Sequence, residues 1–298
     1  MPQPTPQPTP GCWRTLAIDA AIFVVLTLLT QVGGLVWALL VTAYRVLGVR
    51  RHGTLIAVAM LAAIFAFGTL DALGGLAAKT AGRVPLPGCE REAGARLAPA
   101  VPWLCPLQRH YAAPAMRDVL VDLARAMAAR PDGTPEPRQV AVRWLDANFP
   151  AFDGFPLLPH LSHDDGRKVD LAFLYRDGPD RGGGGPVDTV RSRRFGYWAF
   201  EEPRPGDPRP CAGRDDRLTL RWDMDWLPRI GLFHDRLMLD EERTARMIRL
   251  LAADPRVTRI LLEPHLAERL GVAHPKVRFQ GCRAARHDDH IHVEVAGP

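Results

Sequence analysis

The feature that most constrains this chain is a run of 24 uncharged residues from Ala20 to Ala43. At about 1.5 Å per helical residue, such a run is long enough to cross a hydrocarbon layer of about 30 Å. It leads directly into Tyr44 and Arg45 without a small-residue cleavage site. We therefore expect a retained membrane helix, and a cleavable signal peptide is the alternative.

A second apolar segment runs from Thr54 to Leu70, close enough to the first to form a helical hairpin in lipid. A buried helix of a soluble protein is the alternative. The connecting loop carries Arg45, Arg50 and Arg51 and no acidic residue, which places it in the cytoplasm by the positive-inside tendency. We thus expect residues 15–78 to anchor the chain in the lipid bilayer of a bacterial inner (cytoplasmic) membrane, with the C-terminal domain in the periplasm.

The segments around this hairpin differ in character. Residues 1–14 form a Pro-rich tail, residues 79–112 read as a Pro-rich linker, and residues 113–298 form the principal domain. Four cysteines follow the hairpin, at positions 89, 105, 211 and 282, and none is in a C-x-x-C spacing. Three disulfide pairings are possible. Loop length favours Cys89 with Cys105 and Cys211 with Cys282, and four free thiols are the alternative.

Apolar periodicity predicts an α+β fold for the principal domain. The expected helices cover residues 113–129, 240–252 and 264–270, and the expected strands cover residues 140–145, 169–175, 257–262 and 290–295.

Composition argues against two classes of function. The net charge is +5, but only three lysines occur and the arginines are interspersed with Asp and Glu, so we expect no nucleic-acid partner. Ser162 and Ser192 are the two serines of the chain, and neither lies in a G-x-S-x-G or S-x-x-K motif. A serine hydrolase is therefore not expected.

Five of the ten histidines fall in two short blocks, PHLSHDDGRKVD at 159–170 and RHDDHIHVEV at 286–295. His290 and His292 are two apart on an expected strand, so both rings leave the same face of the sheet. His163 and Asp170 flank a turn in the other block. Together the blocks supply two nitrogens and a carboxylate oxygen, the ligand set of an open catalytic zinc site. Solvated or structural histidines are the alternative for an H-x-H pair taken alone.

These two blocks, S-H-x6-D and H-x-x-H-x-H, resemble those of the lysostaphin, D-alanyl-D-alanine metallopeptidase and hedgehog group, and most of all the penicillin-insensitive murein endopeptidases. The resemblance implies an antiparallel-sheet zinc peptidase domain. It implies that His163, Asp170 and His292 bind Zn²⁺ and that His290 lies beside the metal as acid–base or oxyanion-stabilising group. His287 would assist catalysis, and His160 would position ligands or substrate, with a plain structural histidine as its alternative.

The resemblance further implies a zinc metallopeptidase that cleaves amide bonds in peptidoglycan peptides, with D-alanyl cross-links as the target of a D,D-endopeptidase. Related carboxypeptidases have a glutamate where this chain has His287, which favours the endopeptidase. Two alternatives stay open: a D,D-carboxypeptidase of the same fold, and a non-catalytic zinc-containing scaffold that binds murein. Protein partners are not predicted.

Overall fold

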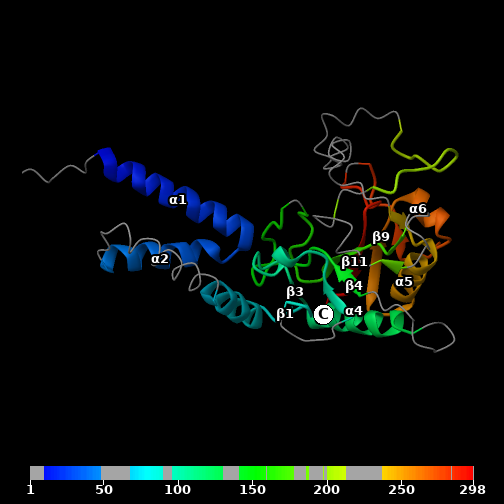
Figure 1. The fold of residues 1–298 in the computed structure, drawn as a ribbon, viewed down its shortest axis with the longest axis horizontal. Coiled ribbons are helices and arrows are strands. Elements are labelled where there is room, and N and C mark those ends of the chain that lie inside the picture. The colour runs from blue at the N-terminus through cyan, green and yellow to red at the C-terminus, as the bar shows by residue number, and fades with distance from the viewer. Residues whose placement is uncertain are drawn as a thin grey trace, which may run out of the picture.

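The computed structural model places a mixed sheet and its helices at one end of the molecule and a helical hairpin at the other (Figure 1). The structure describes residues 10–47, 68–89, 96–129, 141–158, 160–177, 186–187, 197, 200–212, 237–282 and 284–297.

A six-stranded sheet forms the centre of the principal domain. Its strands, in spatial order, are β10 (Val277–Arg278), β9 (Val257–Leu261), β11 (His290–Val295), β5 (Lys168–Ala172), β4 (Val142–Trp144) and β2 (Leu97–Pro99). The inner pairings from β9 to β4 are antiparallel, whereas β10 pairs with β9 and β2 pairs with β4 in parallel. The expectation of an antiparallel sheet is therefore wrong at both edges, where each parallel partner is reached through a connection that contains a helix.

Smaller elements complete the domain. A two-stranded sheet joins β1 (Val84–Pro85) to β3 (Tyr111–Ala112), and a three-stranded sheet has the order β7 (Pro186–Val187), β6 (Tyr175–Asp177) and β8 (Leu237–Leu239). A short 3₁₀ helix, η1, covers Pro102–Leu104. The segment predicted as a linker over 79–112 thus carries β1, β2, η1 and β3.

Helices α4 (Pro114–Met127) and α5 (Glu241–Ala253) share one hydrophobic core with the sheet. Val169 and Leu171 of β5 and Ile291 and Val293 of β11 lie in this core, each fully buried. Helix α6 (Pro264–Arg269) follows β9. The helices expected over 113–129, 240–252 and 264–270 are confirmed as α4, α5 and α6. The expected strands are also confirmed, with 169–175 divided between β5 and the start of β6.

The transmembrane hairpin predicted over residues 15–78 is wrong. The long apolar run does not form one helix. Helix α1 (Pro10–Thr30) ends near the centre of the run, where Gln31 takes a left-handed φ of 66°. Helix α2 (Gly33–Leu47) then runs back along α1. At 15 residues, α2 is about 22 Å long, shorter than a hydrocarbon layer. Within the described ranges no helix combines the length and the apolar character needed to cross a bilayer.

The break at Gln31 is fixed by contacts with the principal domain. The Gln31 side chain accepts a hydrogen bond from the Ala151 amide at 2.7 Å and donates one to the Ala151 carbonyl. Arg45, expected in a cytoplasmic loop, lies in the last turn of α2 and pairs with Asp19 of α1 at 2.8 Å. The prediction of an inner-membrane location with two spans is also wrong, because no helix within the described ranges has the length and apolar character needed to cross a bilayer. Most of the second apolar segment, residues 54–67, lies outside the described residues, and residues 68–80 are helical.

Two disulfides join the cysteines that follow the hairpin. Cys89 pairs with Cys105, and Cys211 pairs with Cys282, with Cα–Cα distances of 5.5 Å in both. The pairing favoured by loop length is confirmed.

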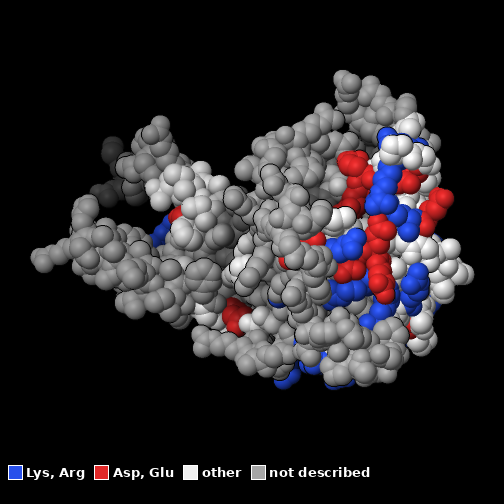
Figure 2. Space-filling model, turned by 45° about the vertical axis from the view of Figure 1, so that its right-hand side comes forward, with Lys and Arg blue, Asp and Glu red and all other residues white. Residues whose placement is uncertain are grey.

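Cationic and anionic side chains are interleaved on the surface of the domain, as Figure 2 shows for one face. Many of these opposite charges form ion pairs: among the described residues, Arg256 pairs with both Asp254 and Asp122, and Arg204 pairs with Glu241.

Candidate metal centre

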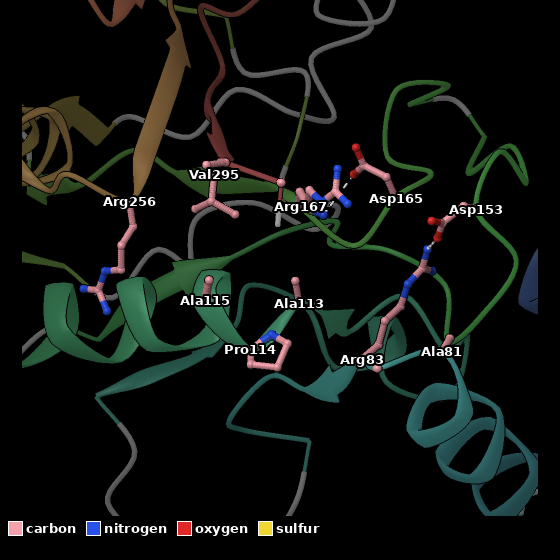
Figure 3. A pocket seen from close by; sticks show the side chains of 13 residues that line it. Ala81, Arg83, Ala113, Pro114, Ala115, Asp153, Asp165, Arg167, Arg256 and Val295 are labelled. Atoms are coloured by element: carbon pink, nitrogen blue, oxygen red, sulfur yellow. Dashed lines mark hydrogen bonds and ion pairs between the residues drawn. The ribbon is translucent and has the colours of Figure 1, made fainter.

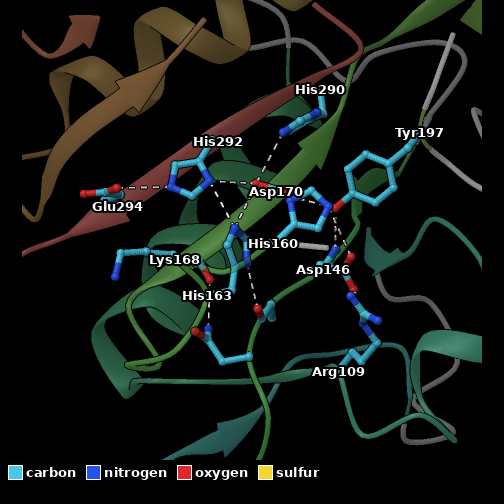
Figure 4. A network of polar contacts seen from close by, with 12 residues as sticks. Arg109, Asp146, His160, His163, Lys168, Asp170, Tyr197, His290, His292 and Glu294 are labelled. Atoms are coloured by element: carbon cyan, nitrogen blue, oxygen red, sulfur yellow. Dashed lines mark hydrogen bonds and ion pairs between the residues drawn. The ribbon is translucent and has the colours of Figure 1, made fainter. Parts of the chain in front are cut away.

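The pairing of β5 with β11 brings the two histidine blocks together. In this antiparallel register His292 lies directly opposite Asp170, and His290 lies opposite Ala172. Because side chains alternate across a strand, Asp170, His290 and His292 share the face turned away from the hydrophobic core. The centre is therefore built on the two middle strands of the sheet (Figure 4).

His163 approaches this face from the turn that precedes β5. Its amide donates to the His160 carbonyl at 3.1 Å, which closes the turn. Its Nδ1 donates to the Ala147 carbonyl at 2.8 Å, and this bond leaves Nε2 as the ring nitrogen with an available lone pair. That nitrogen lies 3.2 Å from Asp170 Oδ1 and 3.1 Å from His292 Nδ1.

The three candidate ligand atoms form a compact triangle, closed by a separation of 2.9 Å between His292 Nδ1 and Asp170 Oδ1. An ion with tetrahedral bonds of about 2.0–2.1 Å needs ligand atoms about 3.3 Å apart. The separations are close to that value, and all three residues are at most 2% exposed. His163, Asp170 and His292 can therefore hold a metal ion without a large rearrangement.

Glu294 fixes which nitrogen of His292 faces this triangle. His292 Nε2 donates to Glu294 Oε1 at 3.1 Å, so Nδ1 is left to bind. Arg259 holds the same carboxylate through two bonds of 2.7 and 2.9 Å. Burial acts to raise the pKa of Glu294, but the hydrogen bonds from His292 and Arg259 lower it to about 2. No motif of the sequence marks Glu294 as part of the site, although its place two residues after His292 puts it on the same strand face.

Tyr197 holds the far oxygen of the shared carboxylate. Its hydroxyl donates to Asp170 Oδ2 at 2.8 Å and accepts from the Asp146 amide at 3.1 Å. Burial raises the pKa of Tyr197 well above its usual value, so the phenol stays protonated as a donor. Burial acts to raise the pKa of Asp170, but the surrounding histidines hold it well below its usual range. No sequence motif marks Tyr197.

His290 lies beside the triangle, as the resemblance implies. Its Nδ1 donates to Asp289 Oδ1 at 2.5 Å, and its Nε2 is 3.7 Å from Asp170 Oδ1. This Nε2 is buried and has no hydrogen-bond partner among the described residues. Burial acts to lower the pKa of His290, but the carboxylates of Asp170 and Asp289 raise it to about 9. A cation on Asp170 would oppose that rise.

His160 and His287 flank the same group. His160 Nδ1 lies 3.3 Å from Asp170 Oδ2, and its ring stacks near Tyr197 with centroids 4.8 Å apart. The His287 ring lies 5.0 Å from that of His290 and 5.7 Å from that of His292. Burial holds the pKa of His287 well below its usual value and lowers that of His160 to about 4. The structure therefore brings together the six residues predicted for the site, which are His160, His163, Asp170, His287, His290 and His292.

Three histidines outside the blocks lie elsewhere. His110 is buried, and burial lowers its pKa to about 4. His265 donates to the Glu201 carbonyl at 2.7 Å, and His274 is exposed. His52 and His234 lie outside the described residues.

A cavity of about 480 Å³ lies at the start of α4 (Figure 3). None of the six candidate site residues lines it, although Asp165, Arg167 and Val295 of the two blocks do. Two of its wall residues, Arg83 and Asp153, form an ion pair with each other. Arg83 also donates to the carbonyls of Phe149 at 2.5 Å and of Ala151 and Asp164 at 3.3 Å. It thereby braces the loop that carries His160 and His163.

No family model matches the chain, and no curated protein matches it significantly.

Proposed function

We propose that this chain is a zinc-dependent peptidase that hydrolyses amide bonds in peptidoglycan peptides, with D-alanyl cross-links as its target. The observation that carries the proposal is the buried triangle of His163 Nε2, Asp170 Oδ1 and His292 Nδ1, with separations of 2.9 to 3.2 Å. Two imidazoles and one carboxylate are the protein ligands of an open catalytic zinc site, in which a fourth position serves water or substrate.

Zinc bound here would supply Lewis acidity, which makes hydroxide available near neutral pH and polarises the scissile carbonyl. The chain supplies the ligands and their orientation. Ala147 fixes His163, Glu294 fixes His292, and Tyr197 fixes Asp170. Such outer contacts determine which ring nitrogen binds and hold it in place.

His290 is the acid–base group in this proposal. Asp289 holds its Nδ1–H, so Nε2 is the atom that takes a proton from the attacking water and returns it to the leaving amine. This nitrogen is directed toward the carboxylate of Asp170 and lies close to the candidate ligands. The preference for cross-links is supported by the resemblance of the motif blocks and by His287, which stands where related carboxypeptidases have a glutamate.

The test uses the purified full chain and cross-linked muropeptide dimers, with and without a chelator. We expect zinc-dependent conversion of dimers to monomers. Substitution of His290 by Ala should leave zinc bound at the triangle of His163, Asp170 and His292 and lower the rate by a factor on the order of 10² or more. His274→Ala removes an exposed imidazole and serves as the matched control.

Other products would redirect the proposal. Release of D-alanine alone would identify a D,D-carboxypeptidase. Binding of murein without cleavage, at any pH and with any metal, would identify a scaffold protein.

A further inference from the structure

We infer that the centre contains a second, weaker site for a divalent cation, formed by His160, His290 and the shared carboxylate of Asp170. The three residues offer one ligand atom each, and these atoms lie within 4.8 Å of one another. Two nitrogens and one oxygen suit Zn²⁺ or another late first-row divalent ion. Asp170 would be shared by the two sites. Its Oδ1 is turned to His163 and His292 and is also the oxygen that His290 Nε2 faces, at 3.7 Å, whereas Oδ2 is turned to His160.

His290 provides the strongest evidence for this site. The residue is 2% exposed, and its Nε2 has no partner among the described residues although it faces Asp170 at 3.7 Å. A buried polar atom without a partner has lost its hydration without compensation. Asp289 holds the other ring nitrogen at 2.5 Å, which is the carboxylate–histidine arrangement that commonly supports a metal ligand.

His160 is oriented in a comparable way. Its Nδ1 faces Asp170 Oδ2 at 3.3 Å, while its Nε2 lies 3.6 Å from Asp146 Oδ2. Asp146 is itself held by Arg109, whose Nε donates to Oδ1 at 2.5 Å. Both histidines therefore turn one nitrogen to a backing carboxylate and the other toward Asp170.

The distances determine the order in which the sites fill. The triangle of His163, Asp170 and His292 already matches tetrahedral ligand spacing, whereas the second group must contract. Repulsion from the first ion weakens the second further, although the carboxylates of Asp146 and Asp289 offset part of it. Carboxylate-bridged pairs of ions are known in hydrolases at separations of about 3.5–4 Å.

Occupancy of the second site has a direct consequence, which rests on the proposed function. The second ion would take His290 Nε2, the nitrogen assigned to proton transfer. Excess zinc should therefore inhibit hydrolysis by about the factor expected for His290→Ala, on the order of 10².

The test is a titration of the metal-free full chain with Zn²⁺ by calorimetry and with Co²⁺ by absorption spectroscopy. We expect two equivalents, the second weaker by about tenfold or more. His160→Ala should bind one equivalent and keep the tighter step. His163→Ala should lose the tighter step, and His274→Ala should bind two equivalents as the matched control.

The outcomes separate this inference from the proposed function. Saturation of the unsubstituted chain at one equivalent, lost in His163→Ala, would overturn the second site and leave the first intact. Two equivalents in His160→Ala would also overturn it. A chain that binds no metal would overturn both. Because the first measurement uses the unsubstituted protein, the inference can fail even if a variant does not fold.

Discussion

Replacement of Arg83 by Met should destabilise the protein by about 1–3 kcal/mol, because the change leaves a buried carbonyl without a hydrogen-bond donor. The Arg83 side chain is 3% exposed and donates to three carbonyls and to Asp153. Two of those carbonyls have other donors, because Gln31 also bonds Ala151 and the Gly154 amide also bonds Asp164.

The magnitude follows from what each partner loses. Asp153 is 71% exposed, so its ion pair contributes little. The carbonyl of Phe149 receives the shortest of the three backbone bonds at 2.5 Å, and a buried acceptor left without a partner costs about 1–3 kcal/mol. Met preserves the apolar stem of the side chain, so packing loss is small.

Urea denaturation followed by circular dichroism measures this change, and a difference of about 1–3 kcal/mol corresponds to roughly 2–12 °C in melting temperature. Arg125→Met is the matched control, because Arg125 is 75% exposed and pairs with Asp122 on the same helix face. Its expected effect is below about 0.5 kcal/mol. Equal stabilities of the Arg83 and Arg125 variants would refute the assignment of Arg83 as a brace.

Three further predictions concern other contacts. Glu294→Gln should weaken metal binding by about 10–100-fold, since Glu294 selects the binding nitrogen of His292. Competition with a chelator measures the affinity, and an unchanged affinity would contradict this role of Glu294. Removal of the Cys211–Cys282 disulfide should lower the free energy of unfolding by about 1 kcal/mol more than removal of Cys89–Cys105, because the disulfides close loops with sequence separations of 71 and 16. Urea denaturation of the two double Cys→Ser variants measures this, and a larger loss of stability without Cys89–Cys105 would contradict it. The pKa of Asp254 is lowered by its hydrogen bonds with Arg256, so its stabilising effect is present above about pH 4 and is lost as pH falls through the lowered pKa. Asp254→Asn should therefore lose less stability than the unsubstituted protein between pH 7 and pH 3, and equal losses would contradict the reasoning.

The principal domain was predictable because its signals are local in sequence. Alternation along β11 predicted that His290 and His292 share one face, as observed, and Ile291 and Val293 lie in the core on the other face. The spacing of the first block likewise put His163 on a turn before the strand of Asp170. The six block residues therefore came from the sequence, whereas the register that sets His292 opposite Asp170 required the structure.

The remaining features depend on contacts between distant segments. Tyr197, Asp146 and Arg109 support the centre from separate parts of the chain, and no spacing rule connects them. The membrane helix predicted from the apolar run is wrong for a related reason. Hydropathy averages over many residues, but a left-handed Gln31 bonded to Ala151, 120 positions away, divides the run into two helices.

The contacts of Gln31 and Arg83 also predict how the molecule opens. Both side chains bind backbone groups between residues 149 and 164, so the turn between α1 and α2 cannot leave the domain without loosening the loop that carries His163. Amides in a shared cooperative unit become open to exchange with a common free energy. In hydrogen exchange, the bonded amides of Ala151 and His163 should therefore gain or lose protection together with that of Val36 at the start of α2.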